Sequence, residues 1–180
     1  MKEVFQLSRK EVMASALSLN SDWEDSPLEA LYVGDRSFAV LDKNWVIKKA
    51  YPAYKKWLNF QNIDKWRNNW DCDNFAYSFK SFLQVLHAQH NPYTFTERRK
   101  NNVKNTTDAE SVAVSVIYYT IKRKGSSSMH AINMLISTTT QGFLAEGCSH
   151  QYSPSFFEPD GGVEVKLSKE EKDSICYINF

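Results

Sequence analysis

The chain has 180 residues, of which 42% are hydrophobic and 14% aromatic, and its formal net charge is +1. This composition is typical of a folded protein with a sizeable core and excludes an intrinsically disordered chain. A charge so close to zero gives no general attraction to nucleic acid or to an anionic membrane, so we expect neither as a partner. From its length, the chain is expected to form a single domain over residues 1–180.

The search for targeting segments and the number of cysteines indicate the expected compartment. No segment is apolar over the length of a signal peptide or a membrane span, which predicts a cytoplasmic protein. Cys72, Cys148 and Cys176 are odd in number and widely spaced. This pattern argues against a disulfide framework and leaves at least one free thiol. The sequence does not indicate an oligomeric state.

The first third of the chain gives weak structural signals. Residues 1–42 are mixed, with a turn near "DWEDSP" and a short strand predicted at "SFAVL". From Asp42 to Phe60, aromatic and basic residues alternate, and Pro52 is expected to divide two short helical segments. We interpret the aromatic residues as core contacts, because a nucleic-acid surface would need more positive charge.

An amphipathic helix is predicted to follow Asp71. Apolar residues recur there at helical spacing, at Phe75, Phe79, Phe82, Leu83 and Leu86. Asp71 is a suitable N-cap, which places Cys72 in the first turn of the helix. The polar, basic residues 90–111 then predict a long loop that is a candidate cover for a cleft.

The rest of the chain predicts strands. Runs rich in β-branched and aromatic residues occupy positions 112–121, 130–137, 142–147 and 175–180. A helix followed by such runs predicts an α+β fold, in which the helix that begins at Cys72 packs on an antiparallel sheet.

Cys72 has the setting of a candidate nucleophile. The first turn of a helix favours the thiolate through unpaired N–H groups and the positive end of the helix dipole. The flanking Asp71 and Asp73 oppose this effect, because like charges disfavour a thiolate. A nucleophilic cysteine also needs a base, and usually a third group that orients the base.

His130 is the best candidate for the base. It opens a predicted strand directly after the flexible segment "KGSSSM". His87 and His90 lie near the far end of the helix, roughly 20 Å or more from Cys72 at about 1.5 Å per residue. His150 falls in a polar segment that is predicted to be a loop. For the third group, a strand returning after "STTTQG" would bring Glu146 beside His130, and Glu158 is the alternative.

These residues carry a resemblance to a known family. "WDCDNFA", then "HAIN", then a hairpin with a glutamate, resembles the papain-like cysteine peptidases of the transglutaminase-like kind. That group includes the protease domain of a fungal chimeric agglutinin and related bacterial and phage proteins. The similarity covers roughly residues 60–150. It implies a papain-like fold, a Cys-His-Glu triad and an acyl-enzyme intermediate.

The resemblance also implies roles for individual residues. Cys72 corresponds to the nucleophile, His130 to the general base and acid, and Glu146 or alternatively Glu158 to the orienting carboxylate. The amide of Asn68 or Asn69 and the Cys72 backbone N–H are candidate oxyanion donors. Trp70, Asp71, Asp73 and Asn133 are expected to surround the catalytic residues and hold them in place.

The sequence departs from the family pattern at three places. Asn74 replaces a second acidic residue, and Met129 replaces the glycine before the histidine, where it would narrow the cleft. "EGC" stands where the family has "EPQ", whereas Glu158–Pro159 retains an E-P pair.

We therefore predict a cysteine peptidase or amidase that acts on a peptide or protein. An acyltransferase of the transglutaminase kind uses the same chemistry and stays open. A catalytically silent papain-like fold that binds a peptide or protein, and an interaction or inhibitory protein that acts through its surface, are the alternatives outside catalysis. We expect no cofactor and no metal, because the CxxC spacing of zinc sites and the ligand-rich loop of calcium sites are both missing.

Overall fold

The computed structural model describes residues 3–20, 31–90, 109–123, 126–138 and 152–180, and the structural statements below concern these residues. The strands are β1 (Glu3–Ser8), β2 (Leu31–Tyr32), β3 (Ser37–Leu41), β4 (Ser111–Val112), β5 (Val114–Arg123), β6 (Ser126–Thr138), β7 (Tyr152–Glu158), β8 (Val163–Val165) and β9 (Tyr177–Asn179). The helical elements are α1 (Arg9–Leu17), α2 (Lys43–Trp45), the π-helical segment η2 (Val46–Ala50), α3 (Tyr51–Phe60), α4 (Cys72–His90) and α6 (Lys169–Asp173).

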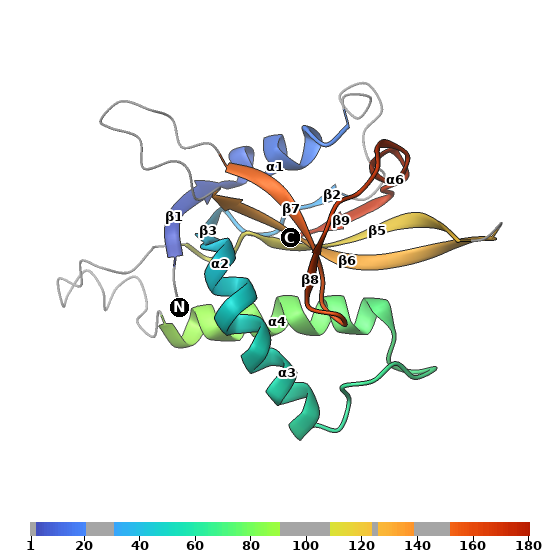
Figure 1. Cartoon of the computed structure of the whole chain (residues 1–180). Coiled ribbons are helices and arrows are strands. Elements are labelled where there is room, and N and C mark those ends of the chain that lie inside the picture. The colour runs from blue at the N-terminus through green and yellow to red at the C-terminus, as the bar shows by residue number, and fades with distance from the viewer. Residues whose placement is uncertain (1–2, 21–30, 91–108, 124–125, 139–151) are drawn as a thin grey trace.

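One large mixed sheet organises the described residues (Figure 1). Its main path runs in the order β1–β3–β6–β5–β9–β2, with β4 on β3 and with β7 and β8 continuing from β6. The pairs β5–β6, β5–β9 and β6–β7 are antiparallel, as predicted. The pairs β3–β4, β3–β6 and β2–β9 are parallel, so the sheet is mixed where the sequence predicted an antiparallel one. The fold is a mixture of helices and a mixed sheet, compatible with the α+β class.

The β5–β6 hairpin forms the centre of the sheet. Its register runs from Val114 opposite Leu135 to Arg123 opposite Ser126. Side chains alternate along β6: Ile132 belongs to the apolar cluster that includes α1, and Leu135 to the cluster that includes α3 and α4. This alternation follows from the two-residue period of a strand, and it gives β6 two buried faces.

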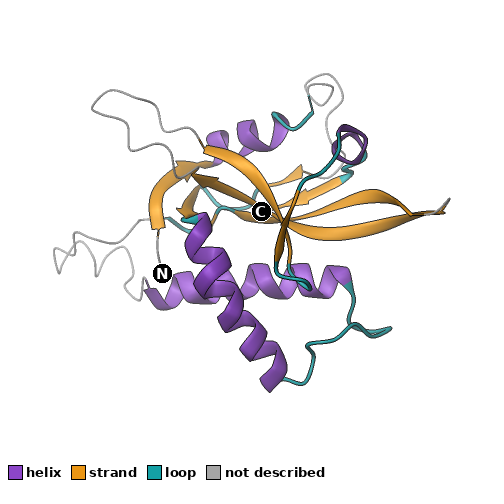
Figure 2. Cartoon of the chain, viewed as in Figure 1, coloured by secondary structure: helices purple, strands orange, loops and turns teal. Residues whose placement is uncertain are grey.

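Helices cover the sheet on both faces (Figure 2). On one face, Phe75, Phe79 and Leu83 of α4 pack with Tyr54 and Leu58 of α3. These α4 residues belong to the predicted apolar stripe, so the amphipathic helix is confirmed. On the other face, Val12 and Ala16 of α1 pack against the sheet.

Two helical features differ from expectation. Residues 1–42 contain α1 as well as strands, and α1 begins with a capping box in which Ser8 and Glu11 bond each other's backbone. Pro52 does not divide two helices, because α2, η2 and α3 follow one another without a break. Tyr51 N–H bonds Val46 C=O five residues back, and Pro52 then sits in the first turn of α3, where its missing N–H costs little.

His87 lies in the last turn of α4, near the far end of the helix as predicted, and it is buried. Its side chain is only 3% exposed, and Nε2 lies 3.0 Å from the carbonyl oxygen of Ala109. The contact holds the chain before β4 against the end of α4.

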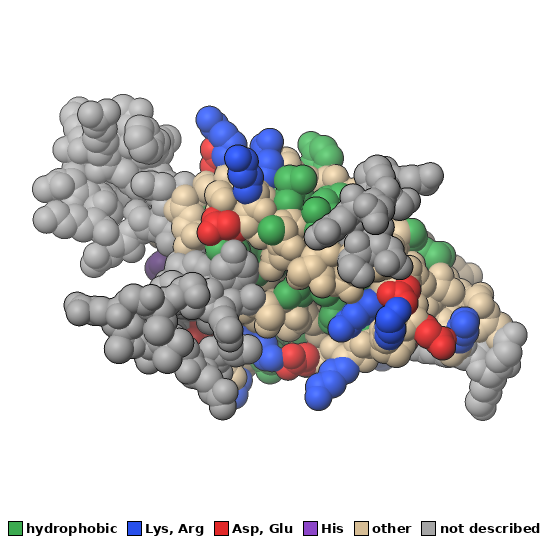
Figure 3. Space-filling view, turned by 90° about the horizontal axis from the view of Figure 1, so that it is seen from above, with side chains coloured by type: hydrophobic (Ala, Val, Ile, Leu, Met, Phe, Trp, Pro, Cys, Tyr) green, Lys and Arg blue, Asp and Glu red, His purple; other side chains and the backbone are tan. Residues whose placement is uncertain are grey.

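The exterior carries mixed charge. In the space-filling view, basic and acidic side chains lie near one another on the face seen from above (Figure 3). Surface ion pairs such as Arg36 with Glu110 are part of this pattern. Within the described ranges, no helix combines the length and apolar character needed to cross a membrane.

Candidate active site

Cys72 is the first residue of α4, and its side chain is partly buried. Polar side chains shape this helix start. Asn74 Oδ1 accepts a hydrogen bond from the Asp71 backbone N–H at 3.2 Å, and Asp73 Oδ1 accepts one from the Asn74 N–H at 2.7 Å. Asn74 therefore acts in the manner of the third helical residue of a capping box. Asparagine at this position therefore caps the helix start, although the family pattern has an acidic residue there.

Small residues bring the start of α4 close to β6. Ala76, Val116 and Ala131 form a buried cluster, against which Cys72 and Tyr118 pack. Asn133, which is fully buried, donates from Nδ2 to Ala76 C=O at 2.9 Å and to Ser115 C=O at 3.2 Å. In "HAIN", alanine and asparagine thus secure α4 from one face of β6, which explains why residues of this type sit at these two positions.

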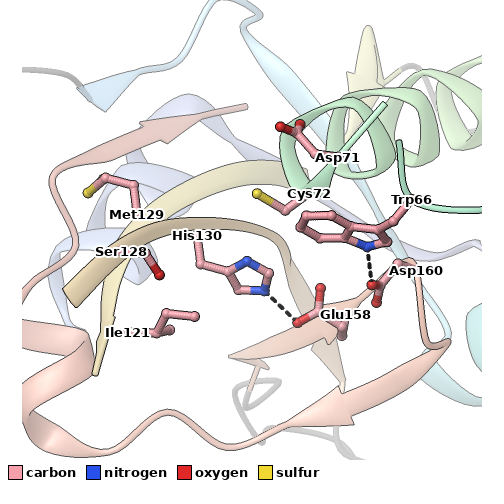
Figure 4. A pocket seen from close by; sticks show the side chains of 9 residues that line it. All are labelled: Trp66, Asp71, Cys72, Ile121, Ser128, Met129, His130, Glu158 and Asp160. Atoms are coloured by element: carbon pink, nitrogen blue, oxygen red, sulfur yellow. Dashed lines mark hydrogen bonds and ion pairs between the residues drawn. The ribbon is translucent and has the colours of Figure 1, made fainter. Parts of the chain in front are cut away.

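His130 is the fifth residue of β6 and does not open the strand, as the sequence predicted it would. It is 7% exposed and is paired in register with Tyr119 of β5. The two rings meet edge to face, with centroids 5.7 Å apart. His130 Nε2 lies 2.8 Å from Glu158 Oε2, and Figure 4 shows the other ring nitrogen pointing toward the Cys72 thiol.

Glu158 reaches His130 because of strand register. β7 pairs with β6 on the edge opposite β5, and the last pair is Asn133 with Phe157. One position further, Glu158 falls beside Ile132, on the same face as His130. Glu158 is thus the carboxylate that contacts the histidine. Glu146 lies outside the described residues, as do Cys148 and His150, and the role predicted for Glu146 stays a prediction.

The turn after Glu158 is fixed by a glycine. Gly162 donates its N–H to Glu158 C=O at 2.8 Å and has φ of +71°, a backbone conformation that glycine adopts without strain. A Cβ at this position would lie 1.9 Å from Tyr51 Cε1. The turn therefore sits directly on the ring of Tyr51, whose hydroxyl donates to Asp160 C=O at 3.3 Å.

The electrostatics favour a protonated His130. Burial alone would lower the pKa of this imidazole, but interactions with the side chains of Cys72 and Glu158, and the negative charge of both, outweigh burial and raise the pKa to about 9. The histidine is then an imidazolium at neutral pH. His130 thus lies between a thiol and a carboxylate, in the order of nucleophile, base and orienting group that covalent catalysis requires.

The raised pKa of His130 makes a prediction about stability. Because the folded-state pKa of about 9 exceeds the ordinary value of 6.5, folding favours the bound proton. The resulting stabilisation is fully present below pH 6.5 and is lost as the pH rises through 9. We expect Glu158→Gln to lower Tm most at the acidic end of this window, with a difference from wild type that shrinks toward its alkaline end.

Thermal denaturation across this pH window measures the effect. Glu164→Gln is a suitable control, since Glu164 lies in the adjacent β8 and pairs with Lys43 instead of a histidine. A Glu158→Gln deficit that stays constant with pH would contradict the assigned ion pair.

A cavity of about 580 Å³ opens beside the Cys72–His130 pair. Trp66, Asp71 and Cys72 line it from the α4 side, Ile121, Ser128, Met129 and His130 from the β5–β6 hairpin, and Glu158 and Asp160 from the turn after β7 (Figure 4). Its volume is within the range of small-molecule and peptide side-chain sites.

The remaining predicted positions occupy different places. Asn68 and Asn69 are exposed in a turn closed by Arg67 and Trp70, and neither lines the cavity. The structure thus does not bring their amides to the site, leaving the Cys72 backbone N–H, in the first turn of α4, as the better-placed oxyanion donor. Trp70 packs edge to face on Phe75, with ring centroids 5.9 Å apart.

The two aspartates that flank Cys72 interact with each other. A hydrogen bond between the Asp71 and Asp73 side chains raises the pKa of Asp71, and burial and the Asp73 charge add to the effect.

Sequence reasoning missed part of the cavity wall. The sequence offered no reason to choose four lining residues, Trp66, Ile121, Ser128 and Asp160. Met129 lines the cavity beside His130, where the sequence predicted that it would narrow the cleft. Neither models of known protein families nor curated proteins match this sequence. The function is therefore inferred from the geometry of the site.

Proposed function

We propose that the protein is a thiol hydrolase, a cysteine peptidase or amidase, with Cys72 as nucleophile, His130 as proton carrier and Glu158 as the group that orients the histidine. The observation that carries the proposal is the position of His130, with one ring nitrogen 2.8 Å from Glu158 Oε2 and the other directed at Cys72. A cavity next to the thiol supplies room for a substrate.

The chemistry follows from these roles. Cys72 Sγ attacks the carbonyl carbon of an amide, and an S–C bond forms. His130 gives its proton to the leaving nitrogen as the C–N bond breaks. Water then attacks the thioester carbon and His130 accepts a proton from that water. The S–C bond breaks, which releases the carboxylic acid and restores the Cys72 thiolate beside the imidazolium. Glu158 stabilises the imidazolium, and the backbone N–H of Cys72 faces the developing oxyanion.

Burial strengthens the hydrogen bond between His130 and Glu158. The side chains of His130 and Glu158 are 8% and 17% exposed, so their hydrogen bond is shielded from competing water. This ion pair fixes the orientation of the His130 ring, so that its other nitrogen faces the Cys72 thiol and the substrate atoms bonded to it.

A peptide library prepared from digested cell protein tests the proposal. We expect wild-type protein to generate new peptide termini, and Cys72→Ala to lose at least about a thousandfold of this activity, as removal of a catalytic nucleophile does elsewhere. Cys176→Ala is the matched control, because Cys176 is the other described free cysteine, and it should retain activity.

Two outcomes of this experiment contradict the proposal. One is cleavage that persists in Cys72→Ala, and the other is the absence of cleavage by the wild-type protein. An excess of a simple alkyl amine in the same reaction distinguishes acyl transfer, because amide products then replace the acids.

A further inference from the structure

The cavity beside Cys72 carries acidic groups at several points of its wall. Asp71, Glu158 and Asp160 all line it, whereas lysine and arginine are missing from the described lining residues. His130 supplies one positive charge, which Glu158 compensates at 2.8 Å. An anionic substrate group would therefore be repelled, and a cationic one would be attracted.

Two basic side chains in the segments next to the cavity have partners elsewhere. The Arg67 guanidinium donates to Asn62 C=O at 2.7 Å, within its own loop. The Lys122 ammonium lies 3.5 Å from Glu170 of α6. These contacts pair Arg67 and Lys122 with groups outside the cavity lining.

Trp66 adds an aromatic wall to this acidic cavity. Its side chain is 53% exposed, although it is a large hydrophobic residue. The indole Nε1 donates to Asp160 Oδ2 at 2.6 Å, so the carboxylate holds the ring at the cavity edge (Figure 4). A carboxylate bonded to the indole N–H also makes the ring face a better partner for a cation.

We propose that this cavity selects substrates with a basic side chain, lysine or arginine, next to the bond that Cys72 attacks. The aliphatic stem of the side chain lies along Trp66, and the charged end is paired by Asp160, with Asp71 adding to the field. This inference rests on the proposed thiol chemistry and adds the substrate class.

Chloromethyl ketones of three N-acetylated amino acids test the selectivity. Lysine and norleucine reagents share a carbon chain and differ in the ammonium group, and a glutamate reagent reverses the charge. Labelling of Cys72 is followed by peptide mapping, and each rate is divided by the rate of the same reagent with 2-mercaptoethanol. We expect the lysine reagent to label Cys72 about tenfold faster than the norleucine reagent, with the glutamate reagent slowest.

Variants assign the preference to residues. Asp160→Asn keeps an oxygen for the indole N–H and removes the charge, and we expect it to reduce the lysine preference to about twofold. Trp66→Leu should reduce it by about two- to fivefold. Glu110→Gln, which removes an equal charge beside Arg36 and outside the cavity lining, should leave it unchanged.

The outcomes separate the two proposals. Equal labelling by the lysine and norleucine reagents, or a preference that survives in Asp160→Asn, overturns the inferred selectivity while rapid labelling of Cys72 keeps the thiol chemistry. Labelling of Cys72 by all three reagents no faster than in the unfolded chain overturns both.

Discussion

Replacing His130 with alanine is expected to slow the alkylation of Cys72 by iodoacetamide about a hundredfold at a pH of about 6.5, because an ordinary thiol is then only about 1% thiolate. In the proposed mechanism, the His130 imidazolium directed at Cys72 stabilises the thiolate, which is the form that reacts. Removal of the ring leaves the helix start as the main support for the negative charge.

Peptide mapping of the alkylated protein measures this rate at Cys72 separately from Cys148 and Cys176. His90→Ala is the matched control, since His90 is exposed at the last residue of the same helix and should leave the rate unchanged. Equal rates for wild type and His130→Ala would show that the histidine does not activate the thiol.

Gly162→Ala is expected to destabilise the protein by about 3 kcal/mol or more, because it combines a strained backbone conformation with a steric clash. The residue has φ of +71°, and the new Cβ would lie 1.9 Å from the Tyr51 ring. The turn that holds Glu158 and Asp160 would have to move, so Cys72 alkylation should also fall.

Gly161→Ala provides a close control for this effect. A Cβ at Gly161 would meet Val163 Cγ2 at 3.8 Å, an ordinary contact. We expect the Gly161 variant to unfold in urea close to the wild-type midpoint, with the Gly162 variant well below it. Similar midpoints for both variants would show that the turn is not fixed as described.

The start of α4 could be predicted from the sequence because its signals are local. The signals are the cap at Asp71, Cys72 directly after it, and the apolar stripe that begins at Phe75, about one turn further on. The choice of His130 also followed from local context, although the strand extends to Ser126 and the histidine lies inside it. The full β5–β6 pairing accounts for this difference, because its register continues to Arg123 opposite Ser126.

The contact between His130 and Glu158 depends on long-range register, which the sequence does not encode locally. The prediction favoured Glu146 because it assumed that the strand after "STTTQG" returns at once. In the described residues, β7 is the strand paired with the second half of β6, and it ends at Glu158. A strand that pairs from a more distant position changes which carboxylate meets the histidine.

Trp66 and Asp160 were missed because neither belongs to a recurring motif. They are 94 positions apart and meet through a single hydrogen bond of 2.6 Å. The Asp-Gly-Gly sequence at Asp160 did signal a turn, yet a turn signal gives no information about its distant partner. By contrast, the missed helix α1 had a readable signal, the spacing of Ser8 and Glu11 that forms its capping box.

The central claim is that Cys72 and His130 form a thiolate–imidazolium pair. The most direct measurement is the ultraviolet absorbance of the thiolate, taken as wild type minus Cys72→Ala, as a function of pH. The account predicts that the absorbance is already present at a pH of about 6.5 and is lost from that pH in His130→Ala. Thiolate absorbance that appears only above a pH of about 8.5, in both proteins alike, would contradict it.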